Sequence, residues 1–202
     1  MNIRSILLAS LVIPFVGCGK DPVRSDGEEA QPNEDRICVL RFSPDGRTLA
    51  SGDTRGTVAV RDGTTGRVIS WVRPHRHVRA VAFAPDGKQL VTVSGDQDLR
   101  IERWNPAGGA SRHTMDKHYA HESAVTLNRE GTVAAVAFSY DEVGGVLVDT
   151  TSGDERPYAE AVKGQPLCLA FSPDGALLAE SVWLKGNRGQ INLRNGTTGE
   201  KI

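Results

Sequence analysis

The pentapeptide Phe42-Ser43-Pro44-Asp45-Gly46 occurs four times in related form. The later copies are Phe83-Ala84-Pro85-Asp86-Gly87, Leu127-Asn128-Arg129-Glu130-Gly131 and Phe171-Ser172-Pro173-Asp174-Gly175. They follow one another at intervals of 41, 44 and 44 residues, which is the length of one four-stranded propeller blade. Because a unit of this size cannot bury its own faces, stacked units must form the core. The sequence therefore predicts an all-β protein built from repeated blades.

The first unit shows how each repeat is expected to fold. Its inner strand is predicted at residues 37–42, and further strands at 48–51, 57–61 and 67–72. Pro44 presets the backbone for the first turn, and Gly46 supplies the positive φ that closes it. A second kind of turn begins with an Asp or Asn and ends with Gly. It recurs at 62–66, 105–109, 149–153 and 195–199.

The repeats resemble the WD-repeat family of β-propellers. The segment that carries the resemblance best is Val78-x-x-Val81-x-Phe83-Ala84-Pro85-Asp86-Gly87, followed by Leu90-Val91 and Ser94-Gly95. The Trp-Asp pair that names the family is replaced by Arg61-Asp62, Trp104-Asn105, Val148-Asp149 and Arg194-Asn195. No Gly-His pair precedes any unit, so the family's buried hydrogen-bond relay is expected to be incomplete. The resemblance covers residues 37–202 and implies blades at 37–76, 77–121, 122–164 and 165–202.

The fourth repeat reaches Ile202 at the point where its outermost strand is expected to begin. The segment ahead of Ile37 has no strand pattern that could replace that strand. Three arrangements are compatible with this pattern: the N-terminal part of a longer propeller, which we favour, a closed four-bladed ring, and an arc completed by another chain. An open arc would expose strand edges, which is a hazard for association.

Residues 1–36 have a different composition from the repeats. A basic start and a short apolar run lead to Phe15-Val16-Gly17-Cys18, which is typical of a secretory signal and resembles the lipobox of bacterial lipoproteins. The resemblance implies lipidation of Cys18 and a cell-envelope location facing the periplasm or the exterior. An uncleaved anchor, a signal cut elsewhere and no export are the alternatives. Residues 19–36 are acidic and poor in apolar side chains, so a disordered tether is expected.

The remaining cysteines and a histidine-rich segment invite chemical interpretations. Cys38 and Cys168 lie in apolar strand patterns and are expected to be buried thiols. A bridge between them would need the first and last repeats to be neighbours, as in a four-bladed ring. His113, His118 and His121 could together bind zinc or copper, but a polar loop that enters the next inner strand is the favoured interpretation.

The function predicted from the sequence is non-catalytic protein binding. The net charge of −1 gives no reason to expect nucleic-acid binding, and no cofactor or metal is expected. A propeller enzyme, either a quinone-dependent dehydrogenase or a hydrolase with catalytic residues outside this chain, is the alternative. In the dehydrogenase case the resemblance rests on Asp62-x-x-Thr65-Gly66 and Trp71. By analogy with the WD family, one face of the propeller carries the candidate partner-binding residues Arg55, Arg73, His75, Arg76, Tyr119, Tyr140, Asp141, Lys185 and Arg188.

Overall fold

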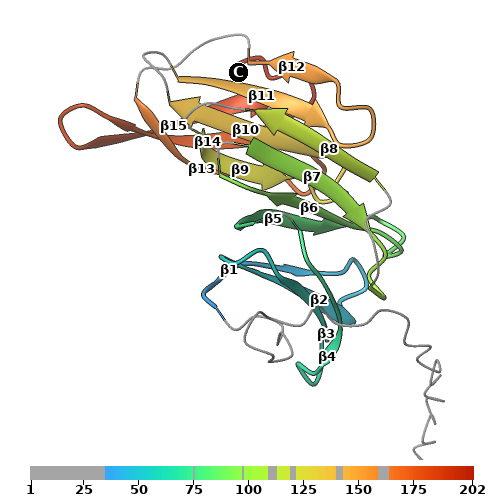
Figure 1. The fold of residues 1–202 in the computed structure, drawn as a ribbon. Helices are drawn as coiled ribbons and strands as arrows, with labels where there is room; N and C mark the ends of the chain where they lie inside the picture. Colours follow the sequence, from blue (N-terminus) through green and yellow to red (C-terminus); the bar gives the residue numbers. More distant parts are fainter. Residues whose placement is uncertain are drawn as a thin grey trace, which may run out of the picture. The chain divides into compact units, whose positions relative to one another are not determined.

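The structure is a computed structural model that describes residues 35–74, 76–96, 98–108, 113–118, 122–139, 143–158 and 164–202. The chain divides into two compact units, residues 1–30 and 31–202, and every described residue belongs to the second unit. All regular secondary structure among the described residues is β-strand (Figure 1). The prediction of an all-β fold is therefore confirmed.

The strands form four antiparallel sheets, which we call blades 1 to 4. Blade 1 contains β1 (Ile37–Phe42), β2 (Thr48–Asp53), β3 (Val58–Asp62) and β4 (Val68–Val72). Blade 2 contains β5 (Val78–Phe83), β6 (Leu90–Ser94), β7 (Asp98–Trp104) and β8 (His113–His118). Blade 3 contains β9 (Glu122–Leu127), β10 (Val133–Ser139), β11 (Val143–Asp149) and β12 (Glu155–Pro157). Blade 4 contains β13 (Gln165–Phe171), β14 (Leu177–Leu184) and β15 (Arg188–Asn195).

Each blade is a meander in which the strands pair in chain order. Blade 4 has three strands, and beyond β15 the described chain adds one antiparallel bridge between Arg194 and Lys201. Within the described residues the fourth sheet thus has three strands, as the sequence indicated. The arrangement is that of propeller blades, with β1, β5, β9 and β13 as the inner strands.

The Pro-Asp-Gly turn forms for the reason that the sequence suggested. The amide of Gly46 donates to the carbonyl of Ser43 at 2.9 Å, and Gly46 has a φ of 71°. The hydroxyl of Ser43 donates to Asp45 Oδ1 at 2.7 Å, and this bond lowers the pKa of the Asp45 carboxyl. The same bond recurs in blade 4, where Ser172 donates to Asp174 at 2.6 Å. The turn therefore carries its own local hydrogen-bond network.

The second turn type uses its first side chain as an acceptor. Asp62 Oδ1 accepts from the amides of Thr65 at 2.7 Å and Thr64 at 3.0 Å. These bonds, led by that from the Thr65 amide, lower the pKa of Asp62 to about 2. Asp149 and Asn195 make the equivalent pairs of bonds in blades 3 and 4. The Asp62-to-Gly66 motif is thus explained as an Asx turn.

The hydrophobic core lies between successive blades. Blades 1 and 2 share one apolar cluster, blades 2 and 3 a second, and blades 3 and 4 a third. In the first of these, Val58 and Val60 of β3 pack with Val81 and Phe83 of β5. The inner strands follow the same order, because β1 contacts β5, β5 contacts β9, and β9 contacts β13. Stacking creates the core, as expected for a repeat protein.

Polar side chains also join neighbouring blades. Arg103 of β7 donates to the carbonyl of Thr150 at 3.2 Å and to its hydroxyl at 2.6 Å. Lys117 of β8 pairs with Glu155 of β12 at 2.8 Å. Between blades 3 and 4, Arg156 donates to the carbonyl of Thr197 at 3.0 Å. These contacts fix each blade to the next outside the apolar core.

One predicted loop is a strand in the structure. Residues His113–His118 form β8, the outer strand of blade 2, with Met115 packed against the core and opposite Ile101. Arg100 of β7 holds Asp116 of β8 through an ion pair of 2.6 Å. The sequence did not predict this strand because its residues are mostly polar, which is typical of a loop but also occurs in an outer strand.

The expectation of two buried thiols is wrong. Cys38 and Cys168 are both exposed, and both are free thiols. Cys168 follows the same register as Ala80 and Ala124, which the next blade covers. It is exposed because no described blade lies against this face of blade 4. Cys38 lies at the irregularity in the β1–β2 pairing, where its sulfur lies 3.0 Å from the carbonyl of Val78.

Candidate interaction surface

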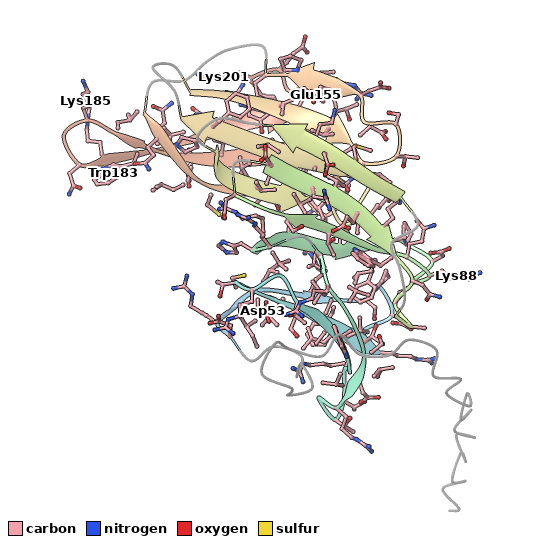
Figure 2. The ribbon with its side chains drawn as sticks, viewed as in Figure 1. Asp53, Lys88, Glu155, Trp183, Lys185 and Lys201 are labelled. Carbon is pink, nitrogen blue, oxygen red and sulfur yellow. The ribbon has the colours of Figure 1, made fainter. Side chains whose placement is uncertain are left out.

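The meander topology gives the blades two opposite ends. We call the end with the β2–β3, β6–β7, β10–β11 and β14–β15 connections and the links between blades the loop end. The other end, which carries the Pro-Asp-Gly and Asx turns, is the turn end. Lys185, from the β14–β15 hairpin, lies toward the left in Figure 2, and Lys88, from the β5–β6 turn, lies toward the right.

The described candidate residues all lie at the loop end. Arg55 lies between β2 and β3, Arg73 and Arg76 between β4 and β5, and Lys185 and Arg188 at the β14–β15 hairpin. All five side chains are exposed. The structure brings the first three together near the junction of blades 1 and 2, whereas Lys185 and Arg188 belong to blade 4. His75, Tyr119, Tyr140 and Asp141 lie outside the described residues.

Arg76 is held in an unusual backbone conformation beside Arg55. Its φ is 93°, which is rare for a residue with a side chain. The neighbouring Gly56 explains how it is held, because a Cβ on Gly56 would lie 2.5 Å from the Arg76 carbonyl oxygen. The β2–β3 and β4–β5 loops therefore pack backbone against backbone. This packing fixes the position of the Arg76 backbone from which the side chain extends.

Acidic groups border these cations. Arg55 Nε lies 2.8 Å from Asp35 Oδ2. The amide of Arg36, followed by the Arg55 side chain, lowers the pKa of Asp35. The buried Asp53 shapes the Arg55 turn, because its Oδ1 accepts from the amides of Arg55 at 3.0 Å and Thr57 at 2.8 Å.

The sequence did not predict that Asp96 meets two side chains of the basic run 73–79 at the loop end. His77 and Arg79 converge on Asp96 at 3.6 and 3.7 Å, and Arg79 also donates to the Gly95 carbonyl at 3.1 Å. The signal available in the sequence was the alternation of His77 and Arg79 with apolar residues at the start of a strand. The arginines at the junction of blades 1 and 2 thus lie beside Asp35, Asp53 and Asp96, so this surface carries charges of both signs.

The inner strands line a cleft of about 810 Å³ that extends toward the turn end. Its apolar walls are formed by Leu40 and Phe42 of β1, Phe83 of β5, Leu127 of β9, and Leu169 and Phe171 of β13. Arg41 and Arg129 supply its cationic groups. Such a lining suits a ligand with apolar or acidic groups. The described walls of the cleft contain no carboxylate paired with a base, as acid–base catalysis would need.

A polar cluster that contains a tyrosine with a strongly raised pKa is buried between blades 3 and 4. Arg194 and Glu180 are fully buried, and each of two guanidinium nitrogens lies 3.3 Å from Glu180 Oε2. The guanidinium carbon lies 4.5 Å from the centroid of the Tyr158 ring. Burial, together with the Glu180 charge, raises the pKa of Tyr158. Because the cluster has no access to solvent, its role is structural.

The cysteines and histidines give no metal centre in the described chain. The sulfur of the exposed residue Cys38 is itself partly shielded from solvent, and this desolvation, together with the Asp53 charge, raises the pKa of the thiol, so it is not activated. Within the described ranges no group of three His, Cys, Asp or Glu residues could hold a metal ion. The side chains of His113 and His118, and all of His121, lie outside the description. The described residues also include no helix long and apolar enough to cross a membrane.

Comparisons with known proteins agree with this architecture. The family model described as "WD domain, G-beta repeat" matches residues 29–62 and 66–101. The chain is 40% identical over 175 residues to WD repeat-containing protein 1-A of Xenopus laevis, covering 81% of this chain and 27% of that protein. It is 38% identical over 68 residues to Actin-interacting protein 1 of Drosophila melanogaster, covering 32% and 11% respectively.

A solved structure shares the fold. The β-propeller domain of Myceliophteria thermophila Cps50 (Swd1) superposes with a TM-score of 0.62 at 21% identity, over 84% of this chain and 54% of that one. Residues 29–62 and 66–101 thus match WD repeats, and the described chain folds as blades of a β-propeller. It spans about a tenth to a quarter of the two curated relatives. These relatives come from eukaryotes, and the match says nothing about residues 1–18.

Proposed function

We propose that this chain is a non-catalytic scaffold that binds an acidic surface of a protein partner through its loop end. The observation that carries the proposal is the group of exposed cations Arg55, Arg73, Arg76, Lys185 and Arg188 at that end. Loops on a rigid scaffold are where binding residues concentrate. The name of the Drosophila relative, an actin-interacting protein, supports binding of a protein as the class of function.

The conformation of Arg76 supports this choice of surface. A positive φ at a residue with a side chain costs about 1–2 kcal/mol, and such residues cluster at functional sites. Here the cost is met by packing on Gly56. Electrostatic complementarity at such a surface would act mainly on the rate and specificity of association.

Charge reversal at the loop end is expected to remove partner binding. The variant Arg73→Glu/Arg76→Glu is compared with Arg67→Glu/Lys88→Glu, which changes two exposed cations at the turn end by the same amount. Each full chain is used as bait, and captured proteins are quantified by mass spectrometry. At least one protein should be retained by the wild-type chain and the turn-end variant and lost from the loop-end variant. Identical capture by all three chains would refute the assignment of the surface.

We also propose that Cys18 is lipidated and anchors the chain in a bacterial cell envelope, with residues 19–36 as a tether. The proposal rests on the residues of the segment ahead of the repeats: a basic start, an apolar run and Gly17-Cys18. Expression with a radiolabelled fatty acid should label the wild-type chain and leave Cys18→Ala unlabelled. Ser10→Ala serves as the control within the same segment and should be labelled like the wild type. Equal labelling of Cys18→Ala would contradict the anchor.

A further inference from the structure

The two residues ahead of β1, Asp35 and Arg36, lie against the β2–β3 loop at the loop end. This loop follows Asp53, which is labelled in Figure 2. The amide of Thr54 donates to the carbonyl of Arg36 at 3.1 Å. The Asp35 carboxylate contacts the next residue of the loop, with 2.8 Å between its Oδ2 and Arg55 Nε. A carboxylate of the chain itself thus occupies one of the cations that the proposed function assigns to a partner.

Backbone hydrogen bonds hold Asp35 in this place. Its Oδ1 accepts from the amide of Arg36 at 2.7 Å, so each carboxylate oxygen has a donor. The bond between Thr54 and Arg36 joins the two segments independently of the ion pair. Asp35 therefore stays beside Arg55 when the ion pair opens, and a group tethered in this way has an effective concentration in the millimolar range or above.

The loop-end arginines differ in whether the chain already supplies a carboxylate. Arg79 has Asp96, and Arg55 has Asp35. Arg73 and Arg76 are exposed, and neither forms an ion pair with any residue that the structure describes. An incoming acidic group can therefore pair directly with Arg73 or Arg76, whereas at Arg55 it must displace Asp35.

The Asp35–Arg55 pair is exposed enough to be exchanged. The Arg55 side chain is 60% exposed and that of Asp35 is 38% exposed. Ion pairs in such surroundings are weak, because water solvates both groups well when they separate. A carboxylate from a partner can therefore replace Asp35 at a small cost, and the Arg36 backbone need not move.

We propose that Asp35 is an intramolecular competitor for the Arg55 guanidinium, and that the partner binds through a segment with several carboxylates. This inference rests on the proposed function of the loop end. A partner with a single carboxylate would exchange one ion pair for another at Arg55 and gain little. A segment with several carboxylates also pairs with Arg73 and Arg76, and this gain offsets the displacement of Asp35. Asp35 thereby makes the loop end selective for polyacidic segments.

A fluorescent hexaglutamate peptide serves as the probe, and fluorescence anisotropy at low salt measures its dissociation constant. All full chains carry Cys18→Ala, which removes the proposed site of lipidation, and circular dichroism checks their folding. The variants are Asp35→Asn, Arg55→Gln and the two combined. Asp86→Asn is the matched control, because it removes the same charge from an exposed residue at the turn end.

Asp35→Asn should bind the peptide about two- to fivefold more tightly than the wild type, which matches the strength of an exposed ion pair. Asp86→Asn should bind like the wild type. Arg55→Gln should bind more weakly, and adding Asp35→Asn to it should change the dissociation constant little, because the cation that Asp35 occupies is gone. An equal gain in the Arg55→Gln chain would mean that Asp35 acts only as a nearby negative charge. That result, or no gain from Asp35→Asn, would overturn the proposal.

The variant Arg73→Glu/Arg76→Glu separates this inference from the proposed function. If it loses the peptide while Asp35→Asn gains nothing, the cationic loop end binds acidic segments but Asp35 does not compete with them. If it binds like the wild type, or if no chain binds the peptide, the assignment of acidic partners to the loop end fails, and the inference fails with it.

Discussion

Replacing Arg194 with valine is expected to lower the free energy of unfolding of the chain by about 3–5 kcal/mol. The substitution leaves the fully buried Glu180 without its cationic partner. Glu180 Oε1 already has no hydrogen-bond partner in the described chain, and the remaining contact of its carboxylate is Asn192 Nδ2 at 3.4 Å. Urea unfolding followed by tryptophan fluorescence measures the loss.

The double variant Glu180→Val/Arg194→Val is the matched control. The strand register places Val136 and Val148 of blade 3 at these same two positions. Removing both charges should therefore restore most of the stability, because an apolar pair can replace a buried ion pair at little cost. If the double variant were as unstable as Arg194→Val alone, the loss would come from packing and not from an unpaired carboxylate.

Phe83→Ala should destabilise the chain by about 3–5 kcal/mol, the range for removing a buried aromatic side chain. Phe83 is buried between blades 1 and 2 with Val58, Val60 and Leu90. Phe42 is the matched comparison. It pairs with Leu49 in blade 1 as Phe83 pairs with Leu90 in blade 2, but its side chain is exposed. Phe42→Ala should cost well under 1 kcal/mol, because the Phe42 side chain is 56% exposed.

The same urea unfolding experiment distinguishes the two positions. Phe83→Ala should shift the unfolding midpoint to a clearly lower urea concentration, whereas Phe42→Ala should leave it nearly unchanged. Equal losses for the two variants would show that Phe42 is covered as well as Phe83 is.

The fold was predictable from local turn chemistry. Gly46 has a positive φ because the sequence Pro-Asp-Gly closes a tight turn, and Asp62 caps its own turn through backbone amides. Such signals act over a few residues, so they can be read from the sequence directly. Repetition of both turns in register then defined the blades.

Burial at the end blades could not be predicted in this way. β1 and β5 have the same apolar pattern, yet Phe42 is exposed and Phe83 is buried. The difference depends on whether another blade lies alongside, which no residue within the strand encodes. The error over Cys168 has the same origin. The buried pair Arg194 and Glu180 was also missed, because charged residues in a sequence are normally assigned to the surface.

The loop end was only partly predictable. Arg55 and Arg76 could be assigned to loops, but their proximity depends on how Gly56 packs against the Arg76 backbone. Arg79 and Asp96 meet because a strand start and a hairpin share one end of blade 2. Contacts such as that of Arg103 with Thr150, on neighbouring blades, depend on stacking and had no local signal.

Disulfide formation within one chain tests the stacking of the blades most directly. A Cβ on Gly52 would lie 2.9 Å from the Cβ of Val78 across the interface of blades 1 and 2. Ser181 in blade 4 has the same register as Gly52. Gly52→Cys/Val78→Cys is therefore compared with Val78→Cys/Ser181→Cys, both in chains with the native cysteines replaced. The account predicts a rapid bond within the chain between positions 52 and 78, and a slow one or none between positions 78 and 181. Bonds that form at equal rates in the two variants, or no bond between positions 52 and 78, would contradict it.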